Sequence, residues 1–73
     1  MNKEVLDSIV PTMSDDEIVE LVQNHLSVLR LIKNKDREDI RIEYGLKNDI
    51  EDSSREELIN ALYKMNEIIM NNR

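Results

Sequence analysis

The segment from Ser14 to Lys33 constrains the fold most, because its apolar residues alone cover a complete helical face. At about 100° per residue, these apolar residues and one histidine fall within roughly half the circumference of a helix. They are Ile18, Val19, Leu21, Val22, His25, Leu26, Val28, Leu29 and Ile32. A face this wide suits a helix packed by two neighbours rather than the narrow seam of a two-stranded coiled coil. The sequence therefore predicts a helical protein organised around this segment.

Side chains that can cap a helix mark the start of this segment. Ser14 suits the N-cap position, and Glu17 three residues later completes a capping box. Met13 and Ile18 occupy the positions of a hydrophobic staple across the cap. We therefore expect the helix to begin directly after Ser14.

A short helix is predicted before it, from Asn2 to Val10, with Asn2 as its cap. Pro11 disfavours helical geometry at Val10 and ends the helix near that residue. A helix of about nine residues is marginal alone, so it must dock onto another element. The broad face of the Ser14 helix is the expected docking place.

The last predicted helix runs from about Ser54 to Asn71. Ser53 and Ser54 are each followed three residues later by a glutamate, which gives two overlapping capping boxes. The apolar stripe of this helix consists of Leu58, Leu62, Met65 and Ile69. Because this stripe resembles the face of the Ser14 helix, we expect the two long helices to pack antiparallel.

The stretch from Ile40 to Leu46 has two interpretations. Its alternation of apolar and polar residues is typical of a strand, which would have to pair with its own copy in a dimer. As a helix, the stretch would be stopped by Gly45, and we favour this interpretation.

The sequence leaves open how the Ser14 helix ends. It either runs on to Tyr44 or breaks near Asn34, in which case Asp36 could cap a new helix. Beyond this region, the polar segment from Lys47 to Ser53 is expected to be a connection.

Together these elements predict an all-α fold in a single domain, residues 1–73. We expect a small bundle of three to four helices, with the two longer helices packed antiparallel and the short N-terminal helix docked on them. The chain has no Cys, Trp or Phe, so its core must be aliphatic and can gain nothing from disulfides or thiolate metal sites. A core this small is only marginally stabilising, so we expect support from a homo-oligomer or a partner protein.

The formal net charge of −6 argues against general binding to nucleic acid or to anionic lipid. No apolar run approaches the ~18 residues of a membrane span, and the N-terminus lacks a signal pattern. We therefore expect a cytoplasmic protein that does not insert into a membrane.

Few residues carry patterns of catalytic or metal chemistry. His25, the only histidine, lies near the centre of the apolar face. We favour a structural histidine with one hydrogen bond; the alternative is a pH-sensitive switch, because protonation of a buried ring would oppose packing. The many carboxylates occupy capping positions, solvent faces and a polar loop, with no nucleophile–base motif. We expect no enzymatic activity, no cofactor and no metal site.

The segment from Arg30 to Arg41 holds the one basic concentration, but acidic residues interrupt it. A nucleic-acid surface would need these acids turned away and lacks neighbouring aromatic residues for stacking. A mixed-charge surface is therefore the favoured interpretation. A homo-oligomeric nucleic-acid-binding regulator that uses this segment is the alternative function.

Several apolar residues fall beside the principal stripes, and with Tyr44 they form the candidate partner-binding set. The set is Leu31, Ile42, Tyr44, Tyr63 and Met70. A contiguous exposed apolar patch marks a protein contact. We therefore expect a non-enzymatic interaction module, an inhibitor or an adaptor, that binds another protein through an exposed helical face.

In composition the chain resembles small early or accessory proteins of large tailed bacteriophages. The resemblance rests on abundant Asn, Ile, Asp and Glu, as in Ile68–Ile69 and Asn71–Asn72, on few Gly or Pro and on the absence of Cys. It implies a protein of the host cytoplasm that binds and inhibits a host or viral protein, such as a host-takeover factor, an anti-defence inhibitor or an antiholin. It covers composition only and assigns no residue.

Overall fold

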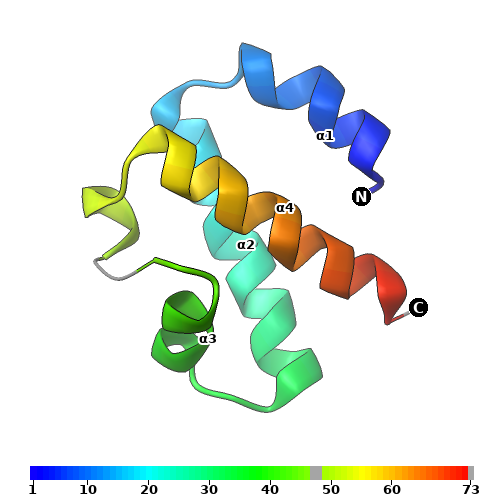
Figure 1. Ribbon diagram of the computed structural model, residues 1–73, viewed down its shortest axis with the longest axis vertical. Helices are drawn as coiled ribbons and strands as arrows, with labels where there is room; N and C mark the ends of the chain where they lie inside the picture. The colour runs from blue at the N-terminus through cyan, green and yellow to red at the C-terminus, as the bar shows by residue number, and fades with distance from the viewer. Residues whose placement is uncertain (47–48, 73) are drawn as a thin grey trace.

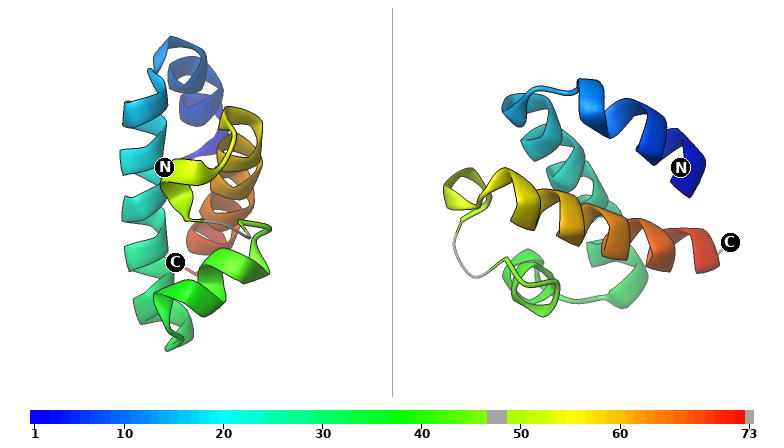
Figure 2. Two further views of the ribbon diagram at one scale, coloured as in Figure 1. Left: turned by 90° about the vertical axis from the view of Figure 1, so that its left-hand side faces the viewer. Right: turned by 45° about the horizontal axis from the view of Figure 1, so that its top comes forward.

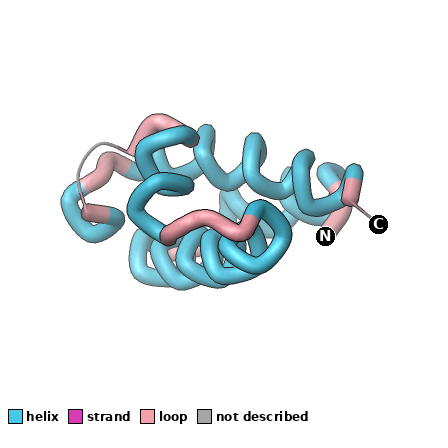
Figure 3. Tube along the Cα trace, turned by 90° about the horizontal axis from the view of Figure 1, so that it is seen from below, coloured by secondary structure: helices cyan, strands magenta, loops and turns pink. Residues whose placement is uncertain are grey.

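The longest helix, α2 (Asp15–Lys33), is the central element of the computed structural model, which describes residues 1–46 and 49–72 (Figure 1). It is joined by α1 (Lys3–Ile9), α3 (Arg37–Glu43) and α4 (Arg55–Asn71), with short 3-10 turns at Val10–Thr12 and Ile50–Asp52. Over the described residues, every regular element is helical, as Figure 3 shows. The predicted small helical bundle is therefore confirmed.

The predicted helix starts are confirmed by their hydrogen bonds. The Ser14 hydroxyl accepts from the Glu17 backbone N–H at 3.2 Å, and the Ser14 N–H donates to the Glu17 carboxylate at 3.0 Å. The hydrogen bond from the Ser14 N–H, and after it one from the Ser14 hydroxyl to the carboxylate, hold the pKa of the Glu17 carboxyl below its usual range. Ser54 makes the same capping box for α4, and Asn2 caps α1 by accepting from the backbone N–H of Val5 at 2.9 Å.

The two long helices run in the same general direction, so the antiparallel prediction is wrong. Arg55 at the start of α4 lies 2.7 Å from Asp15 at the start of α2, and further along Asn66 meets His25 at 3.2 Å. Figures 1 and 2 show the two helices crossing with their N-terminal ends together. The physical reason is the connection: the chain returns along α2 through α3 and the Ile50–Asp52 turn before α4 begins.

The N-terminal helix packs mainly along α4 rather than on the broad face of α2. The Tyr63 hydroxyl of α4 donates to the Asp7 carboxylate of α1, and the Asn66 amide donates to the Met1 carbonyl at 2.6 Å. Low residue numbers of α1 therefore face high numbers of α4, which makes α1 the antiparallel neighbour of α4.

The helical interpretation of Ile40–Leu46 is confirmed, and Gly45 stops α3 as expected. Gly45 has φ +88°, and the N–H groups of Gly45 and Leu46 donate to the carbonyls of Ile42 and Arg41, each at 3.0 Å. This is the Schellman arrangement, which is completed by an apolar contact across the end of the helix. Ile40 and Leu46 hold the positions of that contact, and both are fully buried.

The Ser14 helix does not continue to Tyr44. It ends at Lys33, after which Asn34 takes a left-handed conformation with φ 52° and ψ 44°. Asp36 holds the N-cap position of α3, although its side chain makes no capping hydrogen bond. In the predicted connection, residues 47 and 48 lie outside the described residues, and Ile50 is buried.

The core lies where α1, α3 and the two 3-10 turns close over the contact between α2 and α4. It is aliphatic, as expected, with Met65 as its one sulfur-containing side chain. Its members are Leu6, Val10, Ile18, Val22, Leu26, Leu29, Ile40, Leu46, Ile50, Leu58, Ala61, Leu62 and Met65. Within the described ranges, every helix is too short or too polar to cross a lipid bilayer.

Candidate protein-contact surface

The clearest exposed apolar surface lies on the C-terminal half of α2. Val28, Leu31 and Ile32, which we call the α2 strip, expose 42%, 78% and 39% of their surface. Their spacing of three and four residues places the side chains next to one another on a helix. Leu29 of the same helix is fully buried. Because two residues subtend about 200° of a helix, Leu31 points away from the core.

The α2 strip stays uncovered because the neighbours of α2 pack on its other sides. α4 crosses the buried face, and α3 packs beside the end of α2, where Lys33 bonds Glu43. The wide apolar arc therefore exceeds what α3 and α4 cover. The sequence pattern places Val28 and Ile32 on the packed face; this prediction is wrong, because both side chains are exposed beside Leu31.

The other candidate partner-binding residues lie elsewhere. Ile42 is 57% exposed but belongs to α3, where its neighbours two positions away include the fully buried Ile40. Tyr44 is half-buried against the core, and the Lys33 ammonium lies 5.3 Å from the centre of its ring. Neither residue therefore belongs to the α2 strip.

Tyr63 and Met70 are half-buried and line a cavity of about 520 Å³ between α1 and α4. The Tyr63 hydroxyl is engaged by Asp7, and this hydrogen bond to a carboxylate raises the pKa of Tyr63 above its ordinary value. Tyr63 therefore serves first to hold α1 against α4.

The basic concentration does not form a continuous positive surface. Glu43 lies 2.9 Å from the Lys33 ammonium and 3.5 Å from that of Lys35. The hydrogen bond to Lys33 lowers the pKa of Glu43, and the same bond raises the pKa of Lys33. One carboxylate therefore offsets two of the cations.

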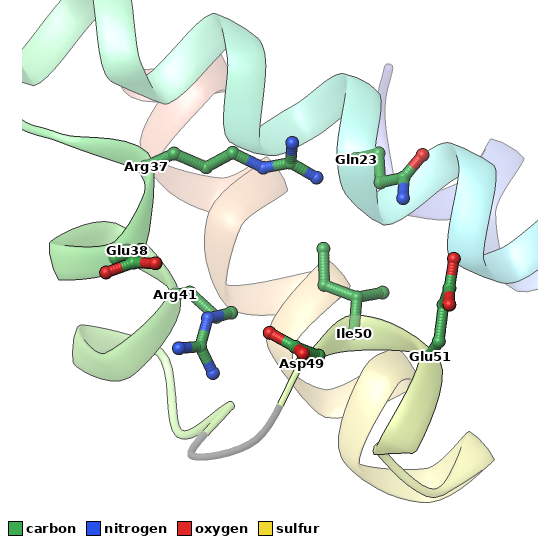
Figure 4. A pocket seen from close by; sticks show the side chains of 7 residues that line it. All are labelled: Gln23, Arg37, Glu38, Arg41, Asp49, Ile50 and Glu51. Atoms are coloured by element: carbon green, nitrogen blue, oxygen red, sulfur yellow. The ribbon is translucent and has the colours of Figure 1, made fainter.

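Two further cations of this segment line a mixed-charge cavity of about 330 Å³ between α2, α3 and the Ile50–Asp52 turn (Figure 4). Figure 4 shows Arg37 extending from α3 toward Gln23 of α2. Arg41 donates to the carbonyl of Leu46 at 2.7 Å. The full lining is Gln23, Arg37, Glu38, Arg41, Asp49, Ile50 and Glu51. Three carboxylates accompany the two guanidinium groups, so the lining has no excess of positive charge.

His25 is buried between α2 and α4, with 8% of its surface exposed. Its Nδ1 lies 2.9 Å from the Leu21 carbonyl and its Nε2 lies 3.2 Å from the Asn66 side-chain oxygen. It thus has a second partner beyond the single hydrogen bond expected. Asn66 itself was missed, although its position four residues after Leu62 places it on the packed stripe of α4.

Among residues 1–46 and 49–72, no three His, Asp or Glu side chains are grouped in a way that could hold a metal ion. Comparison of the chain with models of protein families, with curated proteins and with solved structures finds no match.

Proposed function

We propose that this chain is a non-enzymatic protein-interaction module that binds another protein through the α2 strip. The observation that carries the proposal is the 78% exposure of Leu31 between two further exposed apolar side chains of the same helix. Leaving such side chains in water forfeits the hydrophobic free energy that their burial would release. A partner that covers them recovers it.

The α2 strip stands out from the other exposed apolar residues. Large exposed apolar side chains in the described part of the chain also include Met1, Val5 and Ile42. Val5 and Ile42 lie on two other helices, α1 and α3, so neither belongs to the strip. Scattered exposed apolar residues are common and need no partner, whereas adjoining ones favour a contact.

The size of the α2 strip favours a different protein over a second copy as the partner. A permanent homodimer interface buries about 2,000 Å² or more in total, whereas a transient contact with another protein can bury less than about 1,200 Å², which suits three partly exposed side chains better. A partner with an apolar groove and a positively charged rim would suit a short strip on a chain of net charge −6. An inhibitor or adaptor role, including the phage regulators that the chain resembles in composition, would use such a contact.

The nucleic-acid alternative has less support. The two lysines of the basic segment form ion pairs with Glu43. Its arginines Arg37 and Arg41 line a cavity together with carboxylates. Binding to nucleic acid depends on an excess of cations that neutralise phosphates. We therefore place the interaction at the α2 strip.

Val28→Lys and Val5→Lys form a matched pair that tests this proposal. The two valines expose 42% and 43% of their surface, but only Val28 belongs to the α2 strip. We expect the wild type and Val5→Lys to capture the same protein from a cell lysate, and Val28→Lys to lose at least about tenfold in affinity for it. Equal capture by both variants, with both folded by circular dichroism, would refute the assignment.

A further inference from the structure

His25 faces oxygen acceptors with both ring nitrogens. Nδ1 lies 2.9 Å from the carbonyl oxygen of Leu21, and Nε2 lies 3.2 Å from the side-chain oxygen of Asn66. A neutral imidazole carries one N–H, so it can donate to only one of these oxygens. The imidazolium carries two N–H groups and satisfies both.

Neither acceptor can exchange its oxygen for a donor. The Leu21 oxygen is a backbone carbonyl one helical turn before His25. The Asn66 amide is held in one orientation, because its nitrogen donates to the Met1 carbonyl at 2.6 Å. Turning the amide over would place its oxygen against that carbonyl oxygen and lose the bond. The neutral ring would therefore leave a lone pair facing an oxygen, either the part-buried Leu21 carbonyl or the buried Asn66 oxygen.

We propose that the folded chain holds His25 as the imidazolium, and that this proton fastens α2 to α4 and to the N-terminal segment. Asn66 is the shared link: it contacts His25 of α2 and Met1 through the two ends of one amide. The bundle is then more stable in acid than at alkaline pH as far as this group is concerned. This is the opposite sign to that expected from burial of a histidine alone.

The charged groups near the His25 ring differ in whether they oppose or favour a positive charge on it. The Met1 ammonium bonds the same Asn66 oxygen at 3.3 Å and opposes a second positive charge. On α2, the residues one turn before and after His25 are uncharged. On α4, Glu67 next to Asn66 is exposed, and on α1 the Asp7 carboxylate is engaged by the Tyr63 hydroxyl.

The remaining charges of α1, on Lys3 and Glu4, are exposed and of opposite sign. Among the described residues, the Met1 ammonium is therefore the one positive charge that bonds to this hydrogen-bond network. Against the repulsion from this ammonium, the imidazolium gains two charge-assisted hydrogen bonds, each stronger than its neutral counterpart.

The test compares urea unfolding of the wild type and of His25→Gln between pH 5 and pH 8.5. In the ratio of their folding equilibrium constants, the contributions of the other titrating groups to the pH dependence cancel. Protons that bind more tightly to the folded chain stabilise it at low pH and cease to do so as the pH rises. We expect the ratio of wild type to variant to increase roughly threefold or more on acidification. A ratio that is constant, or that falls in acid, would overturn the proposal.

A measurement on the native chain guards against a variant that does not fold. Long-range ¹H–¹⁵N NMR distinguishes an imidazolium, whose two protonated nitrogens have similar chemical shifts, from a neutral tautomer, whose two nitrogens have very different ones. We expect the imidazolium spectrum in the folded chain at a pH at which the urea-unfolded chain shows the neutral ring. A neutral tautomer in the folded chain at that pH would contradict the proposal.

Discussion

At the scale of the residue, the structure gives two leucines of α2 opposite environments. Leu29 is fully buried and packs in the core, whereas Leu31 is 78% exposed. The two residues have the same side chain and lie two positions apart in the same helix. The pair therefore isolates the effect of burial from the effect of helix propensity.

Leu29→Ala should lower the free energy of unfolding by about 2–5 kcal/mol, because it opens a cavity in a packed core. Leu31→Ala should change it by less than about 0.5 kcal/mol, because little packing is lost. Urea denaturation followed by circular dichroism measures both values. Losses of similar size in the two variants would mean that α2 packs with another face toward the core.

At the scale of the element, helix ends depend on local chemistry and were open to prediction. The starts of α2 and α4 are each fixed by a capping box between residues three positions apart in sequence, Ser14 with Glu17 and Ser54 with Glu57. Gly45 ends α3 because its backbone has φ +88°, a conformation that residues with a Cβ atom rarely adopt. An added Cβ at Gly45 would meet no atom within 4 Å, so only the backbone resists substitution.

Gly45→Ala should therefore destabilise the chain by about 1–2 kcal/mol through backbone strain, with no loss of packing. Gly45→Asn should cost less, since asparagine tolerates the left-handed region better than other residues. Urea denaturation provides the comparison. An alanine variant as stable as the wild type would show that α3 does not end in this geometry.

At the scale of the whole molecule, prediction failed where a property depends on distant parts of the chain. The helical periodicities of α2 and α4 identify their buried faces but not their relative direction. That direction follows from the path of α3 and of the turn at Ile50–Asp52. The same holds for the partnership of His25 with Asn66, which are 41 residues apart.

The candidate contact surface was likewise predictable only in part from the sequence. The pattern of α2 suggested Leu31 as a contact residue, because this leucine falls beside the main apolar face. It also placed Val28 and Ile32 inside that face, where a helix with two packed neighbours would bury them. Which part of a wide face remains in water depends on where the neighbours pack, and only the folded structure shows this.

The most direct test of the proposed contact places a photoreactive phenylalanine derivative at Leu31 and, in a separate variant, at Ile42. Ile42 is a suitable control because it is 57% exposed but lies on α3. On irradiation in cells that produce the protein, we predict one adduct with a different protein from the Leu31 variant and none from the Ile42 variant. No adduct at Leu31, the same adducts at both positions, or an adduct with the mass of two copies would contradict the account.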